Sequence, residues 1–218
     1  MGIILTEEQL TVVQHPPNAH GRVLAGPGTG KSTTAVALAE LLLAQENPPR
    51  VRFLTFTRAA TAELSKKLPP ELSHNLERPS TIHSFAISVL LQNYGCASIP
   101  EPLRIPDDYE YWDLIRPHLA KQVRVPLGKF DDLIAEMSAM WQSLNPEERS
   151  NITPEERAGF MGGWNVHRRV FGYTLLQELP DLLRQALLNY DNLKGIDYDT
   201  LIVDEYQDLN ACDLAVLK

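Results

Sequence analysis

A glycine-rich segment near the start of the chain limits the folds that this sequence can adopt. Residues 25–32 read AGPGTGKS, and they lie between a short apolar run at 22–26, RVLAG, and a helix-forming run at 33–45, TTAVALAELLLAQ. The glycines allow successive backbone N–H groups to approach phosphate oxygens closely, which side chains would prevent. The order of strand, glycine-rich loop and helix therefore predicts a phosphate-binding loop in an α/β fold.

Two further segments predict strands of the same sheet. VRFLTF at 51–56 is β-branched and aromatic, and RAATAELSKKL after it predicts a helix that ends at Pro69. Near the other end, Leu201 to Val203 predict a buried strand that is followed directly by two carboxylates. Strands that alternate with helices indicate βαβ units and a mostly parallel sheet, whose ligands bind at the carboxyl ends of the strands.

The middle of the chain has a different pattern. From about Tyr94 to about Phe171 there is no convincing strand, and helical patterns at 107–120 and 130–141 are separated by proline-rich turns. We therefore expect an inserted all-helical subdomain at 94–171.

The α/β domain is then expected to consist of 1–93 and 172–218, on either side of the insertion. Two PEER segments, at 146 and 154, each follow a helix N-cap candidate, Asn145 and Thr153, and indicate two helix starts inside the insertion. An amphipathic helix at 175–187, kinked at Pro180, is expected to lead back to the sheet.

Composition excludes several classes of protein. With 44% hydrophobic and 22% charged residues the chain is neither disordered nor fibrous, and its net charge of −8 means that any nucleic-acid contact needs a local basic patch. Two cysteines are too few for a disulfide framework. With no targeting pattern at the N-terminus and no apolar run long enough to span a bilayer, we expect a cytoplasmic protein with no membrane partner.

The glycine-rich loop and the acidic pair supply the two halves of a phosphoryl-transfer site. Lys31 is suited to reach the β- and γ-phosphates and the Ser32 hydroxyl to bind Mg²⁺. Asp204 is suited to hold Mg²⁺ through water, and Glu205 to orient and deprotonate the attacking water. A base beside the metal ligand favours hydrolysis, and no DxxG or NKxD segment indicates a GTPase. The alternatives are an ordinary glycine-rich turn and a solvated acidic pair.

Gln9 has two interpretations. Thr6 is a good N-cap for a first helix that ends before Pro16, and Thr6-Glu7-Glu8-Gln9 is a capping box in which Gln9 closes the helix N-terminus. Alternatively, the amide of Gln9 presents a donor and an acceptor that match the edge of adenine.

The order of these segments resembles a known family. Gln9, AGPGTGKST (25–33), FLTFTRAATAEL (53–64), STIHSFA (80–86) and LIVDEYQDLN (201–210) follow one another as in the N-terminal motor of superfamily 1 DNA helicases of the UvrD/Rep/PcrA type. The resemblance covers nearly the whole chain. It implies a RecA-like P-loop NTPase domain with a helical insertion, ATP and Mg²⁺ as cofactors, and 3′-to-5′ translocation on single-stranded DNA.

The resemblance also implies roles for single residues. Gln9 reads adenine, and Gln207 senses the γ-phosphate and joins Glu205 and Lys31 in catalysis. The nucleotide is held by Gln9, Ala25, Gly26, Gly28, Thr29, Gly30, Lys31, Ser32 and Thr33, and the metal by Ser32 and Asp204. The DNA path is lined by Thr57, Arg58, Thr81, His83, Ser84 and Phe85. From the residues alone, Thr57 is equally a helix N-cap, and His83 and Phe85 are equally packing residues.

Two departures from the family pattern affect these expectations. Thr33 stands where many relatives carry an arginine that packs on the nucleotide base. The sequence also stops at Lys218, before the family's later motifs, so we expect an N-terminal piece of a longer helicase whose ATP site is completed by a missing C-terminal half. Such a piece binds nucleotide better than it hydrolyses it.

Other interpretations remain open. The net charge of −8 favours a nucleotide-dependent binding or switch module that does not unwind DNA, and a helicase fused to a nuclease fits the same residues. The expected DNA partners are single strands and single-strand/duplex junctions. In the insertion, two basic clusters are either a solvated helical face or contacts to DNA phosphates. They are Lys121, Arg124 and Lys129, and His167, Arg168 and Arg169.

Overall fold

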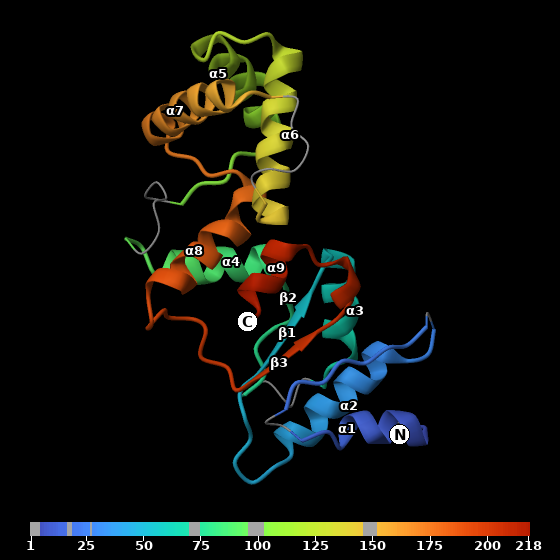
Figure 1. Cartoon of the computed structure of the whole chain (residues 1–218). Coiled ribbons are helices and arrows are strands. Elements are labelled where there is room, and N and C mark those ends of the chain that lie inside the picture. Colours follow the sequence, from blue (N-terminus) through green and yellow to red (C-terminus); the bar gives the residue numbers. More distant parts are fainter. Residues whose placement is uncertain (1–4, 17–18, 27, 70–74, 96–102, 146–151) are drawn as a thin grey trace. The chain divides into compact units, whose positions relative to one another are not determined.

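The structure is a computed structural model of the chain, and it describes residues 5–16, 19–26, 28–69, 75–95, 103–145 and 152–218 (Figure 1). The chain divides into two compact units. Unit 1 comprises Met1–Phe85 and Ile196–Leu209, and unit 2 comprises Ala86–Gly195 and Asn210–Lys218. The expected domain boundaries after residues 93 and 171 stay a prediction, because these units are defined by packing alone.

A small parallel sheet lies in unit 1. Its strands are β1 (Val51–Thr55), β2 (Ser80–Thr81) and β3 (Thr200–Val203), in the order β2-β1-β3 (Figure 1). Phe53 pairs with Ile202, and Leu54 with Ser80. The parallel sheet and its strands at 51–56 and 201–203 are as predicted, although β3 is half-buried rather than buried, since it pairs on one side only among the described strands.

Helices pack on one face of this sheet. They are α1 (Glu7–Val13), α2 (Lys31–Leu43) and α3 (Arg58–Lys67), and α4 (Ile82–Gln92) begins in the same unit. Because side chains alternate along a strand, Val51 and Phe53 share the face that packs against Val36 of α2 and Leu64 of α3. All four of these side chains are buried. The sequence thus places the glycine-rich loop directly before a helix that belongs to the core.

The expected strand at 22–26 is absent, and this prediction was wrong. The segment has no regular structure, and Val23 and Leu24 are 50% and 80% exposed. An apolar run becomes a strand only when a neighbouring strand pairs with its backbone, and none of the described strands does so. The loop that follows nevertheless ends where α2 begins, as the motif requires.

Unit 2 is helical within its described residues. It contains a π-helical turn, η2 (Glu110–Ile115), followed by α5 (Arg116–Gln122), α6 (Leu127–Ser143) and α7 (Pro154–Phe171). Their buried side chains form a core around Phe130, Phe160 and Trp164. The prediction that the described part of 94–171 holds no strand is confirmed. Thr153 starts α7 with a capping box, whereas the PEER segment at 146–149 lies outside the described residues.

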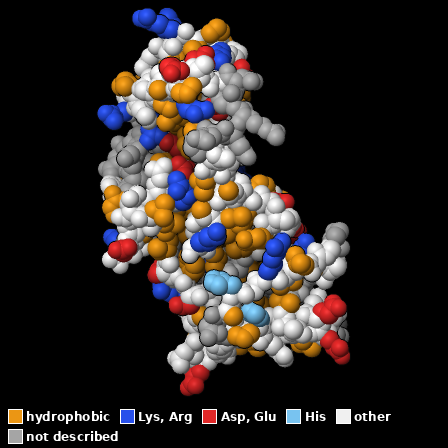
Figure 2. Space-filling view, viewed as in Figure 1, with side chains coloured by type: hydrophobic (Ala, Val, Ile, Leu, Met, Phe, Trp, Pro, Cys, Tyr) orange, Lys and Arg blue, Asp and Glu red, His pale blue; other side chains and the backbone are white. Residues whose placement is uncertain are grey.

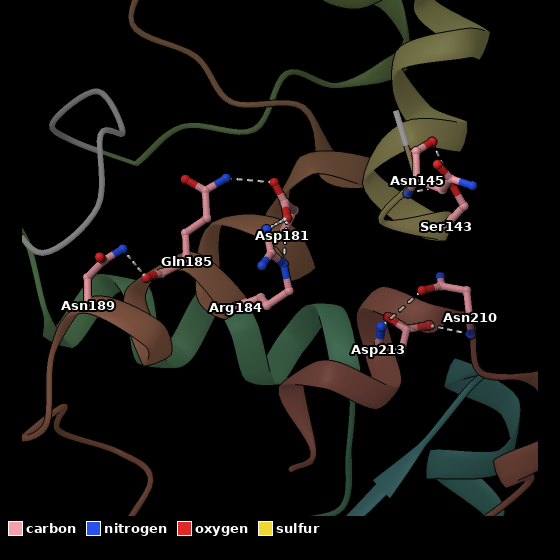
Figure 3. Close-up of polar contacts among 8 residues, drawn as sticks. All are labelled: Ser143, Asn145, Asp181, Arg184, Gln185, Asn189, Asn210 and Asp213. Atoms are coloured by element: carbon pink, nitrogen blue, oxygen red, sulfur yellow. Dashed lines mark hydrogen bonds and ion pairs between the residues drawn. The ribbon is translucent and has the colours of Figure 1, made fainter. Parts of the chain in front are cut away.

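The chain leaves the insertion through a short 3-10 turn, η3 (Leu176–Glu178), and α8 (Leu179–Asn189), and it ends in α9 (Ala211–Val216). Pro180 lies in the first turn of α8, where it starts the helix. The expected kink is therefore wrong, because a proline lacks only an N–H that has no partner in a first turn. Figure 3 shows the polar contacts of this region, in which Asp181 accepts hydrogen bonds from Arg184 and Gln185.

The two basic clusters of the insertion do not both reach the surface. His167 is 2% exposed, and Arg168 is buried and paired with Glu178, so the second cluster is not a charged face. In the first cluster Lys129 pairs with Glu156 at 3.4 Å, while Lys121 and Arg124 are exposed. On the described part of the face drawn in Figure 2, Lys and Arg side chains form separate groups rather than one stripe. No helix among the described residues is long and apolar enough to cross a membrane.

Candidate nucleotide and single-strand site

The glycine-rich loop presents backbone N–H groups at the start of α2. Gly28 and Gly30 have φ values of +75° and +84°, in the left-handed region that favours glycine. The hydroxyl of Thr29 donates to the carbonyl oxygen of Gly26 at 2.7 Å, which holds the loop in a turn. No side chain caps the first turn of α2, so its N–H groups and the positive end of the helix dipole are available to an anion.

The predicted metal ligands lie together. Asp204 directly follows β3, and its Oδ2 accepts a hydrogen bond of 3.2 Å from the hydroxyl of Ser32 in the first turn of α2. The two residues are 172 positions apart in the sequence. A carboxylate and a hydroxyl are oxygen ligands of the kind that Mg²⁺ takes when phosphates supply the remainder. Among the described residues no group of three His, Cys, Asp or Glu side chains forms a metal site.

The predicted catalytic residues meet beside this pair. Lys31 Nζ lies 3.8 Å from Glu205 Oε2, and the side-chain amide of Gln207 donates to the same carboxylate. Glu205 adopts φ +54°, a left-handed conformation that is uncommon for a residue with a side chain. Strained backbone of this kind clusters at functional sites. The structure thus brings Lys31, Glu205 and Gln207 into one group.

Gln9 shows the geometry of its structural interpretation and also a contact to the loop. Its Oε1 accepts from the backbone N–H of Thr6 at 2.9 Å, and the Thr6 hydroxyl accepts from the backbone N–H of Gln9 at 3.3 Å, which completes the capping box of α1. Its Nε2 also donates to the carbonyl oxygen of Thr29 at 3.2 Å. Gln9 therefore lies beside the glycine-rich loop, whichever interpretation holds. Ala25 and Gly26 are exposed at the start of the loop, and Thr33 is half-buried in α2.

The candidates for the DNA path come from two segments of unit 1. Thr57 and Arg58 follow β1, and both are exposed. The Thr57 hydroxyl accepts from the backbone N–H of Ala60 at 3.1 Å, so Thr57 is the N-cap of α3. Arg58 forms no ion pair with another described residue, which leaves its guanidinium available to a phosphate.

The second segment is less exposed. Thr81 is buried and its hydroxyl accepts from the backbone N–H of Ser84 at 3.2 Å, while His83 is half-buried and Ser84 exposed. Phe85 is 1% exposed and meets the ring of Tyr198 edge-on, with 6.2 Å between centroids. The packing interpretation accounts for Phe85, whose ring is not available to a DNA base in this structure.

The structure reveals an aromatic residue that the sequence reasoning missed. Phe56 is 45% exposed directly after β1, whose five residues are all buried, and it precedes Thr57 and Arg58. An aromatic ring at the end of a strand, next to an arginine without an ion pair among the described residues, is suited to stack on a base of a single strand. The signal was present in the sequence, because Phe56 is the last residue of the VRFLTF run and directly precedes two residues that were singled out.

Comparison with known proteins agrees with this site. Residues 5–218 match the model of the UvrD/REP helicase N-terminal domain. The chain belongs to that family. A probable DNA helicase II homologue of Mycoplasma capricolum is 23% identical over 99% of this chain and 32% of its own length. An ATP-dependent helicase/nuclease of Clostridium beijerinckii is 28% identical, in one of its subunits, over 48% of this chain and 10% of that subunit's length. The chain therefore spans about a third or less of these relatives.

The family membership confirms the resemblance drawn from the five motifs. It also bears on the two segments that carry them, because a match over 5–218 includes both the glycine-rich loop and the residues after β3.

Proposed function

We propose that this chain is the N-terminal, nucleotide-binding part of an ATP-dependent DNA helicase with a RecA-like P-loop domain, which moves 3′-to-5′ on single-stranded DNA. The observation that carries the proposal is the meeting of two distant segments. Ser32 contacts Asp204, and Lys31 pairs with Glu205, in a family of helicase domains. A loop suited to phosphates and a carboxylate suited to a metal are the two halves of an ATP site.

Each residue of the group has a chemical task in this proposal. The N–H groups at the start of α2 and the Lys31 ammonium bind the phosphates of ATP, and Gln9 lies where it can contact the adenine. Ser32 and Asp204 hold Mg²⁺, which when bound neutralises charge on the phosphates. Glu205 accepts the proton of the attacking water. Gln207, which already bonds Glu205, senses the γ-phosphate.

The Lys31–Glu205 pair has to part when nucleotide binds. Its separation of 3.8 Å and the partial exposure of both side chains make the pair weak, so a phosphate competes for the ammonium at little cost.

The DNA path is proposed to run along the carboxyl end of β1 and the first turn of α4. Phe56 offers a ring to a base, Arg58 a cation to a phosphate, and Thr57, His83 and Ser84 offer polar groups beside them. Thr81 positions this turn through its bond to Ser84. The substrates are single strands and their junctions with duplex, and the protein is proposed to act in the cytoplasm.

The chain alone is proposed to bind ATP better than it hydrolyses it, because the relatives that it matches are at least three times its length. In phosphoryl-transfer enzymes an arginine from a second domain or partner supplies a factor of about 10³ to 10⁵ in rate. The rest of the relatives' length is the proposed source of such a group.

Two substitutions test the ATP site. Lys31→Ala removes a charged donor to phosphate and should weaken Mg-ATP binding about tenfold or more. Glu205→Gln keeps the shape of the site but removes the base, so affinity should stay within about twofold while hydrolysis falls about 100-fold. Binding is measured by titration with a fluorescent ATP analogue, and hydrolysis by phosphate release with and without single-stranded DNA.

The matched control is Lys67→Ala, which removes an equal charge from an exposed pair with Glu63. Its affinity and rate should equal those of the wild type. A preference for GTP, or an unchanged affinity in Lys31→Ala, would contradict the proposed site.

A nucleotide-dependent switch module without unwinding activity is the second candidate, and the net charge of −8 favours it. Photo-cross-linking of a labelled oligonucleotide separates the two functions. Cross-links at Phe56 or Arg58 support the helicase, whereas a nucleotide-bound chain that yields none supports the switch. A helicase joined to a nuclease, as in the name of the Clostridium relative, is compatible with the first candidate.

A further inference from the structure

The central strand of unit 1 contains a buried charge. All five residues of β1 are buried, and the second of them is Arg52, which is 6% exposed. The alternation of a strand places Arg52 on the face opposite Val51 and Phe53, away from the apolar core formed with α2 and α3.

The guanidinium group of Arg52 has three partners. Its Cζ lies 4.9 Å from the ring centroid of Phe85 and 5.8 Å from that of Tyr198. Its Nη2 lies 2.7 Å from Oε2 of Glu77. Both ring distances are within the reach of cation–π attraction, so the charge is held by two rings and one carboxylate.

These partners belong to segments that end in different parts of the candidate site. Phe85 directly follows Ser84 in the first turn of α4, and Glu77 lies just before β2. Tyr198 lies two residues before β3, which ends at the metal candidate Asp204. One side chain on the central strand therefore contacts both the segment of the DNA candidates and the strand of the metal candidate.

Packing alone does not explain this residue. Burying a charge costs several kcal/mol unless its partners compensate, and an apolar residue of similar volume is often as stable or more stable. The other four positions of β1 hold uncharged residues at 0% exposure. Glu77 is half-exposed, so the ion pair is partly screened by water.

We propose that Arg52 is a positioning residue that couples the nucleotide site to the single-strand contacts. A movement of β3 when nucleotide binds beside Asp204 shifts Tyr198, and the guanidinium passes that shift to Phe85 and so to the first turn of α4, which carries His83 and Ser84. The inference rests on the proposed function, because it needs one chain that binds both nucleotide and single-stranded DNA. Coupling of this kind is reciprocal and is measured as a ratio of affinities.

The test is the ratio of single-strand affinities without and with nucleotide. A fluorescein-labelled oligo-dT is titrated by anisotropy in the absence and presence of Mg²⁺ and a non-hydrolysable ATP analogue. The wild type should show a ratio of about fivefold or more, the lower end of typical coupling. Arg52→Met, which fills the space without charge, should bring the ratio below about twofold, while the affinity for the analogue without DNA is unchanged.

Arg50→Met is the matched control. Arg50 lies next to the same strand and pairs with Asp197 in the segment before β3, but both side chains are exposed. It loses the same charge and should keep the wild-type ratio. Arg52→Lys, which leaves a cation at the rings, should give an intermediate ratio. All variants are compared at a temperature where their circular dichroism matches that of the wild type, so that loss of stability is not read as loss of coupling.

The outcomes separate the two proposals. A wild-type chain that binds neither ligand overturns the proposed function, and this inference with it. A wild-type chain that binds both, with a ratio of one or with a ratio that Arg52→Met leaves unchanged, overturns the role of Arg52 and leaves the proposed function standing.

Discussion

A buried histidine in unit 2 links the stability of the inserted helices to pH. His167 is 2% exposed, its Nε2 lies 2.9 Å from Nδ1 of His118, and its Nδ1 lies 3.0 Å from the hydroxyl of Tyr173. Burial, followed by the charge of His118, lowers the pKa of His167 to about 4. Above about pH 6.5 His167 is neutral in both the folded and the unfolded chain, and the fold has its full stability.

As the pH falls below 6.5 the unfolded chain takes up a proton that the folded chain refuses, so stability is lost until about pH 4. The free energy of unfolding should therefore fall by about 2 kcal/mol from this group between pH 7.5 and 5.0. Urea titrations followed by tryptophan fluorescence at both pH values measure it. His167→Gln should lose less stability than the wild type over this interval; an equal loss in both would show that other groups cause it.

The residues of the candidate site divide by what fixes their chemistry. The spacing of the glycine-rich loop was enough to predict where Lys31 and Ser32 lie, because the loop must bring backbone and side chain to one anion. Contacts between distant segments had to come from the fold. Arg168 was expected at the surface and Phe85 at a DNA base, yet both are buried, and burial depends on segments that a local pattern does not contain.

Among the elements, helices with their own caps were predicted better than strands. A capping residue acts within one turn, so the starts of α1, α3 and α7 can be recognised from a few neighbouring residues. The strand expected at 22–26 failed because strands need partners from elsewhere. β2 was missed because it has two residues, and α4 because its sequence is apolar without a clear polar face.

The cap of α7 gives a prediction about a single helix. Thr153 accepts from the backbone N–H of Glu156 at 3.2 Å, and Glu156 Oε2 accepts from the backbone N–H of Thr153 at 2.9 Å. Thr153→Ala should lower the free energy of unfolding by about 1 kcal/mol, because a donor at the helix start loses its partner. Thr153→Ser keeps the hydroxyl and should retain most of the stability. Urea unfolding followed by the fluorescence of Trp164, in the same helix, measures both variants.

Across the whole molecule, two cores imply two folding units with separate probes. One core joins β1 to α2 and α3, and the other joins the helices of the insertion. Trp112, Trp141 and Trp164 are the three tryptophans of the chain, and all lie in unit 2. The candidate ATP site lies in unit 1. Tryptophan fluorescence therefore reports on the unit that does not contain that site.

Nucleotide should then stabilise only one of two thermal transitions. A ligand at 100 times its Kd adds about 2.7 kcal/mol to the unit that binds it, which raises the Tm of a unit of this size by roughly 10 °C. We expect Mg-ATP to raise the transition seen by circular dichroism, which reports on both units, and to leave the transition seen by tryptophan fluorescence in place. Lys31→Ala should abolish the shift. Equal shifts in both signals would mean that the two cores unfold as one cooperative body, and that binding energy gained at the glycine-rich loop also stabilises the inserted helices.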